Sequence, residues 1–155
     1  MKLSTKGQYA VLAMVDLARN SMGEPVTLTA IAERQSLPLH YLEQLFMKLR
    51  RHNLVKSVRG QGGGYLMARA PENVTIADIM VAVEEPLSST RCEPDQGISC
   101  LGRKEKCLTH HLWEDLTEHI VSYLASVSLA RICARAPMTA PAFNPLQGEK
   151  KALQG

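Results

Sequence analysis

The sequence of 155 residues predicts a mainly α-helical fold with one small β-hairpin and a long helix near its end. Apolar residues recur at helical spacing over residues 8–52, and residues 108–127 carry the longest such stripe of the chain. Between them, the glycine-rich residues 60–64 separate two short runs that are typical of strands. No apolar run approaches the roughly 18 residues that span a bilayer, and no signal-peptide segment opens the chain. We therefore expect a cytoplasmic protein without a membrane segment.

Three helices are predicted before the hairpin. The first covers about residues 8–19, and the second covers 30–35, with Thr29 as its N-cap. After a tight turn, Pro38 is expected at the first helical position of a third helix over 39–52. The apolar face of this third helix consists of Leu39, Leu42, Leu45, Phe46 and Leu49. Two short helices joined by a tight turn predict a helix-turn-helix motif.

A hairpin directly after such a motif predicts a wing, here with strands over 54–59 and 65–69. Its glycine-rich tip follows Arg59, so that the backbone can approach a groove while a guanidinium enters it. A glycine-rich run can also bind nucleotide phosphate. This run lacks the Lys-Ser/Thr ending of a P-loop and joins two strands, which argues against that reading.

Charge indicates a polyanionic partner. Residues 34–69 contain seven Lys or Arg against one acid, Glu43, a net charge of +6. That surplus suits a DNA phosphate backbone, although charge alone fits a solvated basic face equally well. On the third helix, Glu43 can accept a hydrogen bond from cytosine, and Gln44 can bond adenine. We expect base contacts from His40, Tyr41, Glu43 and Gln44, a minor-groove contact from Arg59, and phosphate contacts from Lys6, Lys48, Arg50 and Arg51.

The second half of the chain is predicted to contain a helix, a loop and a longer helix. A capping box at residues 75–78 opens a helix to about Glu85, and residues 87–107 form a loop. The stripe on the long helix consists of Leu112, Leu116, Ile120, Tyr123 and Val127. This stripe either packs on the core of its own chain or pairs with a second copy; we favour a dimerisation helix. The expected units are 1–86 (winged helix-turn-helix), 87–107 (loop), 108–136 (dimerisation helix and a short helix) and 137–155 (a tail).

The loop contains a cluster of metal-binding residue types. Seven residues separate Cys92 from Cys100, six separate Cys100 from Cys107, and two separate Cys107 from His110. Three thiolates and an imidazole complete a four-ligand site, for zinc or for an iron–sulfur cluster. The wide spacings favour a cluster, and the adjacent His111 could replace His110. Cys133 lies apart and is expected in the core.

Four segments together resemble one known family. They are residues 1–10 (MKLSTKGQYA), 41–46 (YLEQLF), 58–65 (VRGQGGGY) and 107–110 (CLTH). They resemble the bacterial winged-helix regulators that control iron–sulfur cluster assembly genes, over about residues 1–135. The resemblance implies a homodimeric repressor, not an enzyme, that binds palindromic DNA and a [2Fe-2S] cluster. The implied ligands are Cys92, Cys100, Cys107 and His110, with cysteine spacings longer than those typical of the family. It also implies that Glu43 repels some operators unless the cluster is bound.

Three other functions are compatible with parts of this sequence. A nitric-oxide sensor of the same family would hold a [4Fe-4S] cluster, but the histidine of the CLTH segment argues against it. A zinc-stabilised winged-helix regulator would not sense a cluster at all. A redox enzyme is disfavoured, because the sequence has no Cys-x-x-Cys, no cofactor motif and no candidate Ser-His-Asp set.

Overall fold

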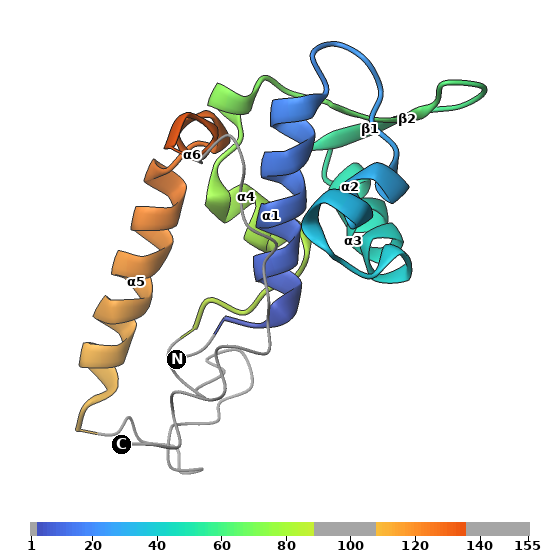
Figure 1. Cartoon of the computed structure of the whole chain (residues 1–155). Helices are drawn as coiled ribbons and strands as arrows, with labels where there is room; N and C mark the ends of the chain where they lie inside the picture. Colours follow the sequence, from blue (N-terminus) through green and yellow to red (C-terminus); the bar gives the residue numbers. More distant parts are fainter. Residues whose placement is uncertain (1–2, 89–107, 136–155) are drawn as a thin grey trace.

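The computed structural model describes residues 3–88 and 108–135 (Figure 1). Its helices and strands follow the predicted order, so the predicted fold class is confirmed. The loop residues 89–107, with Cys92, Cys100 and Cys107, and the predicted tail 137–155 lie outside the described residues. The elements are α1 (Thr5–Asn20), α2 (Leu28–Gln35), α3 (Leu39–Arg51), β1 (Val55–Val58), β2 (Gly64–Met67), the 3₁₀ helix η1 (Pro71–Asn73), α4 (Ile76–Ala82), α5 (His110–Ser126) and α6 (Leu129–Arg135).

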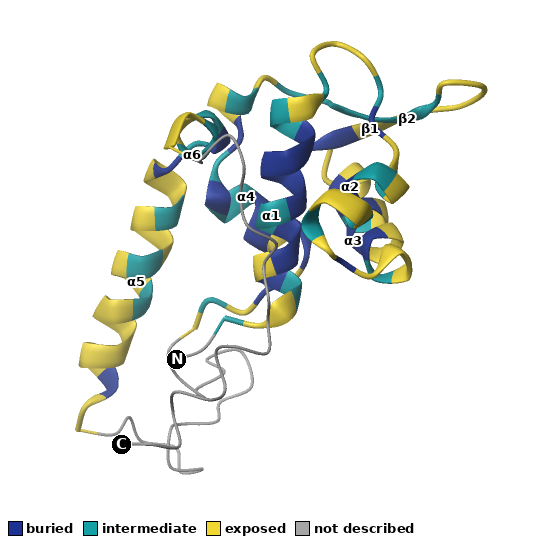
Figure 2. Ribbon diagram, viewed as in Figure 1, coloured by how far each residue is buried: buried dark blue, intermediate teal, exposed yellow. Residues whose placement is uncertain are grey.

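Helix α1 is the centre of the fold. It packs against α2 and α3 on one side and against α4 and α6 on the other. Ala10, Ala13, Met14 and Leu17 are fully buried along it, and Figure 2 shows buried residues gathered around α1. Small alanines allow neighbouring helices to approach closely, whereas Met14 and Leu17 fill the space between them.

The helix-turn-helix starts earlier than its sequence pattern predicts. Thr27, and not Thr29, is the N-cap of α2: its Oγ1 accepts a hydrogen bond from the Ala30 amide at 3.1 Å. Ser36 ends α2 with a φ of 53°, and this left-handed residue makes the tight turn. Pro38 is the N-cap of α3, one position before the expected one.

The wing is a two-stranded antiparallel hairpin. Its register runs from Val55 opposite Met67 to Val58 opposite Gly64. The amide of Tyr65 donates to Val26 O at 2.8 Å, and the amide of Val26 donates to Tyr65 O at 2.9 Å. These bonds tie the base of the wing to the segment before α2, while its tip projects from the body (Figure 1).

The capping box of α4 is confirmed. Thr75 Oγ1 accepts from the Asp78 amide at 3.1 Å, and Asp78 Oδ2 accepts from the Thr75 amide at 2.9 Å. The helix ends at Ala82, earlier than expected, and Glu84 follows it with a φ of 56°.

Helix α5 extends away from the body, and α6 returns to pack on α1 and η1 (Figure 1). Val127, the last member of the predicted stripe, lies beyond the end of α5 and is buried, with its carbonyl accepting from the Ile76 amide at 3.0 Å. Three other members, Leu112, Leu116 and Tyr123, are exposed. In the described part of the chain, no helix is long and apolar enough to cross a membrane.

Candidate nucleic-acid interface and cofactor segment

Three of the four predicted base-reading residues form one exposed patch at the start of α3. Nε2 of His40 lies 3.1 Å from Nε2 of Gln44, one turn further along the helix. Nδ1 of His40 lies 3.8 Å from Oε2 of Glu43, and both side chains are mostly exposed. The patch therefore presents an imidazole, an amide and a carboxylate side by side, which are hydrogen-bonding groups suited to base edges.

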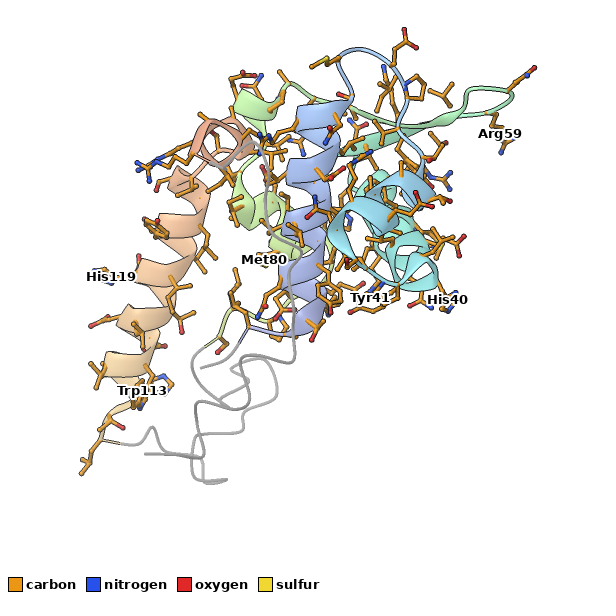
Figure 3. The ribbon with its side chains drawn as sticks, viewed as in Figure 1. His40, Tyr41, Arg59, Met80, Trp113 and His119 are labelled. Atoms are coloured by element: carbon orange, nitrogen blue, oxygen red, sulfur yellow. The ribbon has the colours of Figure 1, made fainter. Side chains whose placement is uncertain are left out.

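Tyr41, the fourth predicted base-reading residue, lies apart from this patch. Its ring meets the ring of Tyr9 on α1 edge to face, with centroids 5.8 Å apart at 81°. It is half-buried, and this burial, with the nearby charge of Glu85 as a lesser cause, raises the pKa of its hydroxyl. Tyr41 thus stands on the flank of α3 toward α1 (Figure 3).

Arg59 lies at the projecting end of the wing, away from the helices (Figure 3). Gly60 and Gly62 have φ values of 102° and 73°, which side chains rarely adopt, and the Gly63 amide closes the turn on Gly60 O at 3.0 Å. The glycine-rich tip therefore carries an exposed guanidinium on a narrow backbone turn, a shape that can enter a minor groove.

The four predicted phosphate-binding residues occupy two places. Arg50 and Arg51 are exposed at the end of α3, where Arg50 Nη1 lies 3.4 Å from Ser57 Oγ on β1 and Arg51 Nη2 lies 3.9 Å from Met47 Sδ. Lys6 and Lys48 instead converge on Glu84, in the turn after α4.

Of the four predicted metal ligands, His110 lies within the described residues. It is the first residue of α5 and is 8% exposed, and its Nε2 lies 3.0 Å from Glu114 Oε1. His111 also contacts Glu114, through Nδ1 at 3.3 Å, but its side chain is 78% exposed. The two neighbouring histidines therefore differ sharply in burial although they share one carboxylate.

Cys133 on α6 packs against the core, as predicted. Its Sγ lies 3.9 Å from Val15 O, and burial raises the pKa of the thiol. A partly buried neutral thiol is a poor metal ligand, which argues against Cys133 as a ligand.

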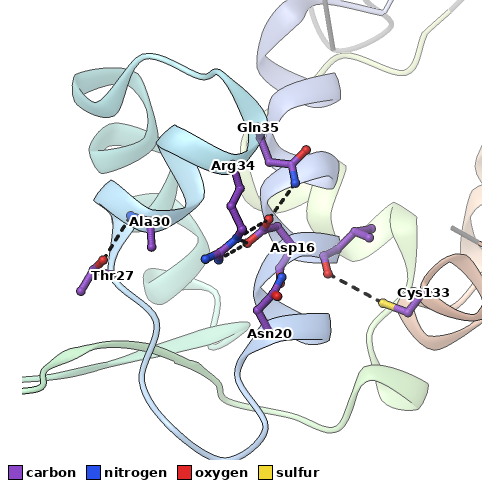
Figure 4. A network of polar contacts seen from close by, with 8 residues as sticks. Asp16, Asn20, Thr27, Ala30, Arg34, Gln35 and Cys133 are labelled. Carbon is purple, nitrogen blue, oxygen red and sulfur yellow. Dashed lines mark hydrogen bonds and ion pairs between the residues drawn. The ribbon is translucent and has the colours of Figure 1, made fainter. Parts of the chain in front are cut away.

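The structural roles of three acidic residues were not predicted from the sequence. Asp16 is buried on α1 beside Arg34 and Gln35 (Figure 4), and Glu84 and Glu85 anchor the end of α4. An acid within the apolar run of α1 and an acidic pair directly after a helix were visible signals. Their partners lie far away in sequence and were not visible.

Comparison with known proteins identifies the family of this chain. Residues 3–135 match the model of a family described as Rrf2, iron-dependent transcriptional regulator. The chain belongs to the Rrf2 family. Among Rrf2 relatives, the HTH-type transcriptional regulator IscR of Xenorhabdus nematophila is 49% identical over 132 residues, which cover 85% of this chain and 79% of the relative.

Solved structures agree with the assignment. CymR, the global cysteine regulator of B. subtilis, superposes with a TM-score of 0.74 at 33% identity, covering 88% of this chain and 99% of CymR. T. potens IscR superposes with a TM-score of 0.72 at 37% identity, covering 95% and 96% of the two chains. The protein is therefore an IscR-like, DNA-binding transcriptional regulator of the Rrf2 family.

Proposed function

We propose that this Rrf2 protein senses iron–sulfur cluster supply in the cytoplasm and regulates, mainly by repression, the genes for cluster assembly. In this proposal, the homodimer binds palindromic DNA, and occupancy of a [2Fe-2S] cluster sets affinity and specificity. The observation that carries the sensing half of the proposal is the burial of His110 at the start of α5, three residues after Cys107 in the sequence.

His110 suits a cluster ligand. Metal-bound histidines usually donate their second ring nitrogen to a carboxylate, which fixes the orientation of the ring. The contact of His110 Nε2 with Glu114 has this form, so Glu114 would orient the ring of His110 if this residue holds a cluster. Cys92, Cys100 and Cys107 would supply the remaining ligands, a donor set that suits iron–sulfur chemistry. When bound, such a cluster supplies a redox-active iron centre that oxidants can destroy.

The DNA-binding half rests on the exposed patch of α3 and on the wing. In the proposed complex, α3 enters the major groove, and His40, Glu43 and Gln44 reach base edges there. Arg59 enters the adjacent minor groove, and Tyr41 contacts DNA from the flank of α3. Lys6, Lys48, Arg50 and Arg51 bind phosphates and set the register without reading sequence.

The exposed apolar side of α5 supports the homodimer. Leu112, Leu116 and Tyr123 are 57%, 41% and 63% exposed, although they recur at helical spacing like a buried stripe. Contiguous exposed apolar side chains mark association sites in soluble proteins. Pairing α5 with its copy would cover them and place two α3 helices for two half-sites.

The first test is the visible spectrum of anaerobically purified protein, with iron and acid-labile sulfide counted per chain. About two of each, with broad bands between about 320 and 600 nm, supports the proposal. About four iron and four sulfide per chain would favour the nitric-oxide sensor. A colourless protein with stoichiometric zinc would contradict cluster sensing and leave only the proposed DNA binding. His110→Ala should lose the cluster faster than His111→Ala, and the reverse order would assign the ligand to His111.

A second test concerns Glu43, for which we propose a further role in repelling some operators when the cluster is absent. Glu43→Ala should make the cluster-free protein discriminate less between operator classes. Gln44→Ala is the matched change on the same patch and should weaken binding without that change of preference. Unchanged relative affinities in Glu43→Ala would contradict this role.

A further inference from the structure

We propose that Glu84 is a positioning residue that lowers DNA affinity by competing with phosphate for Lys48 and Lys6. The inference rests on the proposed phosphate contacts of these two lysines. Glu84 lies outside α3 and the wing, and in this proposal it is one of the groups that set how tightly the regulator binds DNA.

The contacts of Glu84 join three parts of the fold, namely α1, α3 and the turn after α4. Nζ of Lys48, on α3, forms an ion pair and hydrogen bond with Oε2 of Glu84. Nζ of Lys6, on α1, donates to the main-chain oxygen of the same residue at 2.7 Å. The ammonium groups of two helices are therefore held by one residue, through its carboxylate and through its carbonyl.

The turn that carries Glu84 is fixed in place. Glu84 has a φ of 56°, and its amide donates to Val81 O at 3.0 Å. The next residue, Glu85, is 6% exposed, and its carboxylate accepts hydrogen bonds from the amide of Ser4, at 2.7 Å, and from the Ser4 hydroxyl. Since Glu85 is anchored on the start of α1, Glu84 is held beside Lys6 and Lys48.

The carboxylate can compete with DNA because it remains charged and accessible. The side chain of Glu84 is 70% exposed, and that of Lys48 is 31% exposed. The hydrogen bond from Lys48 holds the pKa of Glu84 below its ordinary value, so the acid stays ionised near neutral pH. Exposed ion pairs contribute little to folding stability. A lysine that is paired with a carboxylate is, however, less available to neutralise a DNA phosphate and thereby displace its counterions.

The test is the salt dependence of DNA binding by the full-length protein, measured on one duplex with Glu84→Gln, Lys48→Gln and the double variant. Glu84→Gln should bind roughly five- to tenfold tighter at about 0.1 M salt, with a salt slope steeper by about 0.9, as expected for one more phosphate contact. Lys48→Gln should weaken binding. In the Lys48→Gln background, Glu84→Gln should lose most of its effect.

The control is Glu72→Gln, which removes the same charge from an exposed acid of η1. Equal tightening by Glu72→Gln, or equal tightening by Glu84→Gln with and without Lys48, would show a general charge effect and overturn the inference. Weaker or unchanged binding of Glu84→Gln would also overturn it. If Lys48→Gln alone leaves binding unchanged, the proposed phosphate contact of Lys48 is wrong, and the competition at Lys48 falls with it.

Discussion

Arg34 binds both carboxylate oxygens of the buried Asp16 and thereby joins α2 to α1 (Figure 4). Nη2 lies 2.6 Å from Oδ1, and Nε lies 3.1 Å from Oδ2. The side chain of Asp16 is 1% exposed and that of Arg34 is 39% exposed. Gln35 adds a third donor at 2.7 Å. The hydrogen bond to Asp16 raises the pKa of Arg34. Because Arg34 and Gln35 of α2 both contact Asp16 of α1, these bonds fix the first helix of the helix-turn-helix on the core.

The first prediction follows from this pair. Arg34→Ala leaves the buried carboxylate of Asp16 with Gln35 but without its cation, and breaking buried pairs costs about 3–5 kcal/mol. Because Arg34 is partly exposed, water can replace part of its contact, and we expect about 2 kcal/mol of lost unfolding free energy. Urea unfolding measures it. Arg59→Ala, on the exposed wing, is the control, and equal urea midpoints for the two variants would contradict the prediction.

The fold was largely predictable because helical and strand periodicities are local. The start of α2 was predicted wrongly because Thr27 and Thr29 are both good N-caps. What decides between them is long-range: Val26, just before Thr27, pairs with Tyr65 of the wing and holds the chain extended up to that point. Pro38 was misplaced by one residue for a related reason, since proline suits the N-cap as well as the first helical position.

The candidate site was predictable where it depends on one helix. His40, Glu43 and Gln44 follow from a spacing of three and four residues. Tyr41 follows His40 directly, about 100° further around the helix, so it faces α1 and Tyr9. The pairing of Lys48 with Glu84 spans 36 residues of sequence, and that of Arg34 with Asp16 spans 18. Only the packing of the helices brings such partners together.

The second prediction concerns the base of the wing. A Cβ on Gly64 would lie 2.5 Å from the main-chain oxygen of Val26, closer than real contacts allow. Gly64→Ala should therefore break the pairing of Val26 with Tyr65 and cost about 1–3 kcal/mol. Thermal unfolding and hydrogen exchange at the Tyr65 amide measure the effect. Gln61→Ala, at the exposed tip of the same hairpin, should change neither, and a fully protected Tyr65 amide in Gly64→Ala would contradict the prediction.

The third prediction uses the thiol of Cys133. In a variant with serine at positions 92, 100 and 107, the alkylation rate should rise with pH around a midpoint above that of an ordinary cysteine, because burial raises the pKa of this thiol. The raised pKa means that the neutral thiol stabilises the fold below the unfolded pKa, and this contribution is lost as pH rises through the folded pKa. The same variant in urea is the control. An equal pH midpoint of alkylation with and without urea would contradict this prediction.

The fourth prediction tests the exposed face of α5. Leu116→Glu places a charge within the stripe, and burying that charge against a second copy would be costly, so the homodimer should dissociate to a monomer. Light scattering at a fixed protein concentration measures the mass. Binding to a palindromic duplex should weaken more than binding to a single half-site, because dissociation removes the linked second contact.

Ala125→Glu supplies the matched control for that experiment. Ala125 is also exposed, and it lies nine residues beyond Leu116, which places it on the opposite side of α5. It introduces the same charged side chain into the same helix, so any general effect on helix stability appears in both variants. A dimer in Ala125→Glu and a monomer in Leu116→Glu locate the interface on the stripe. Dimers in both variants would exclude the stripe as the interface, and the apolar face of α5 would then need another partner.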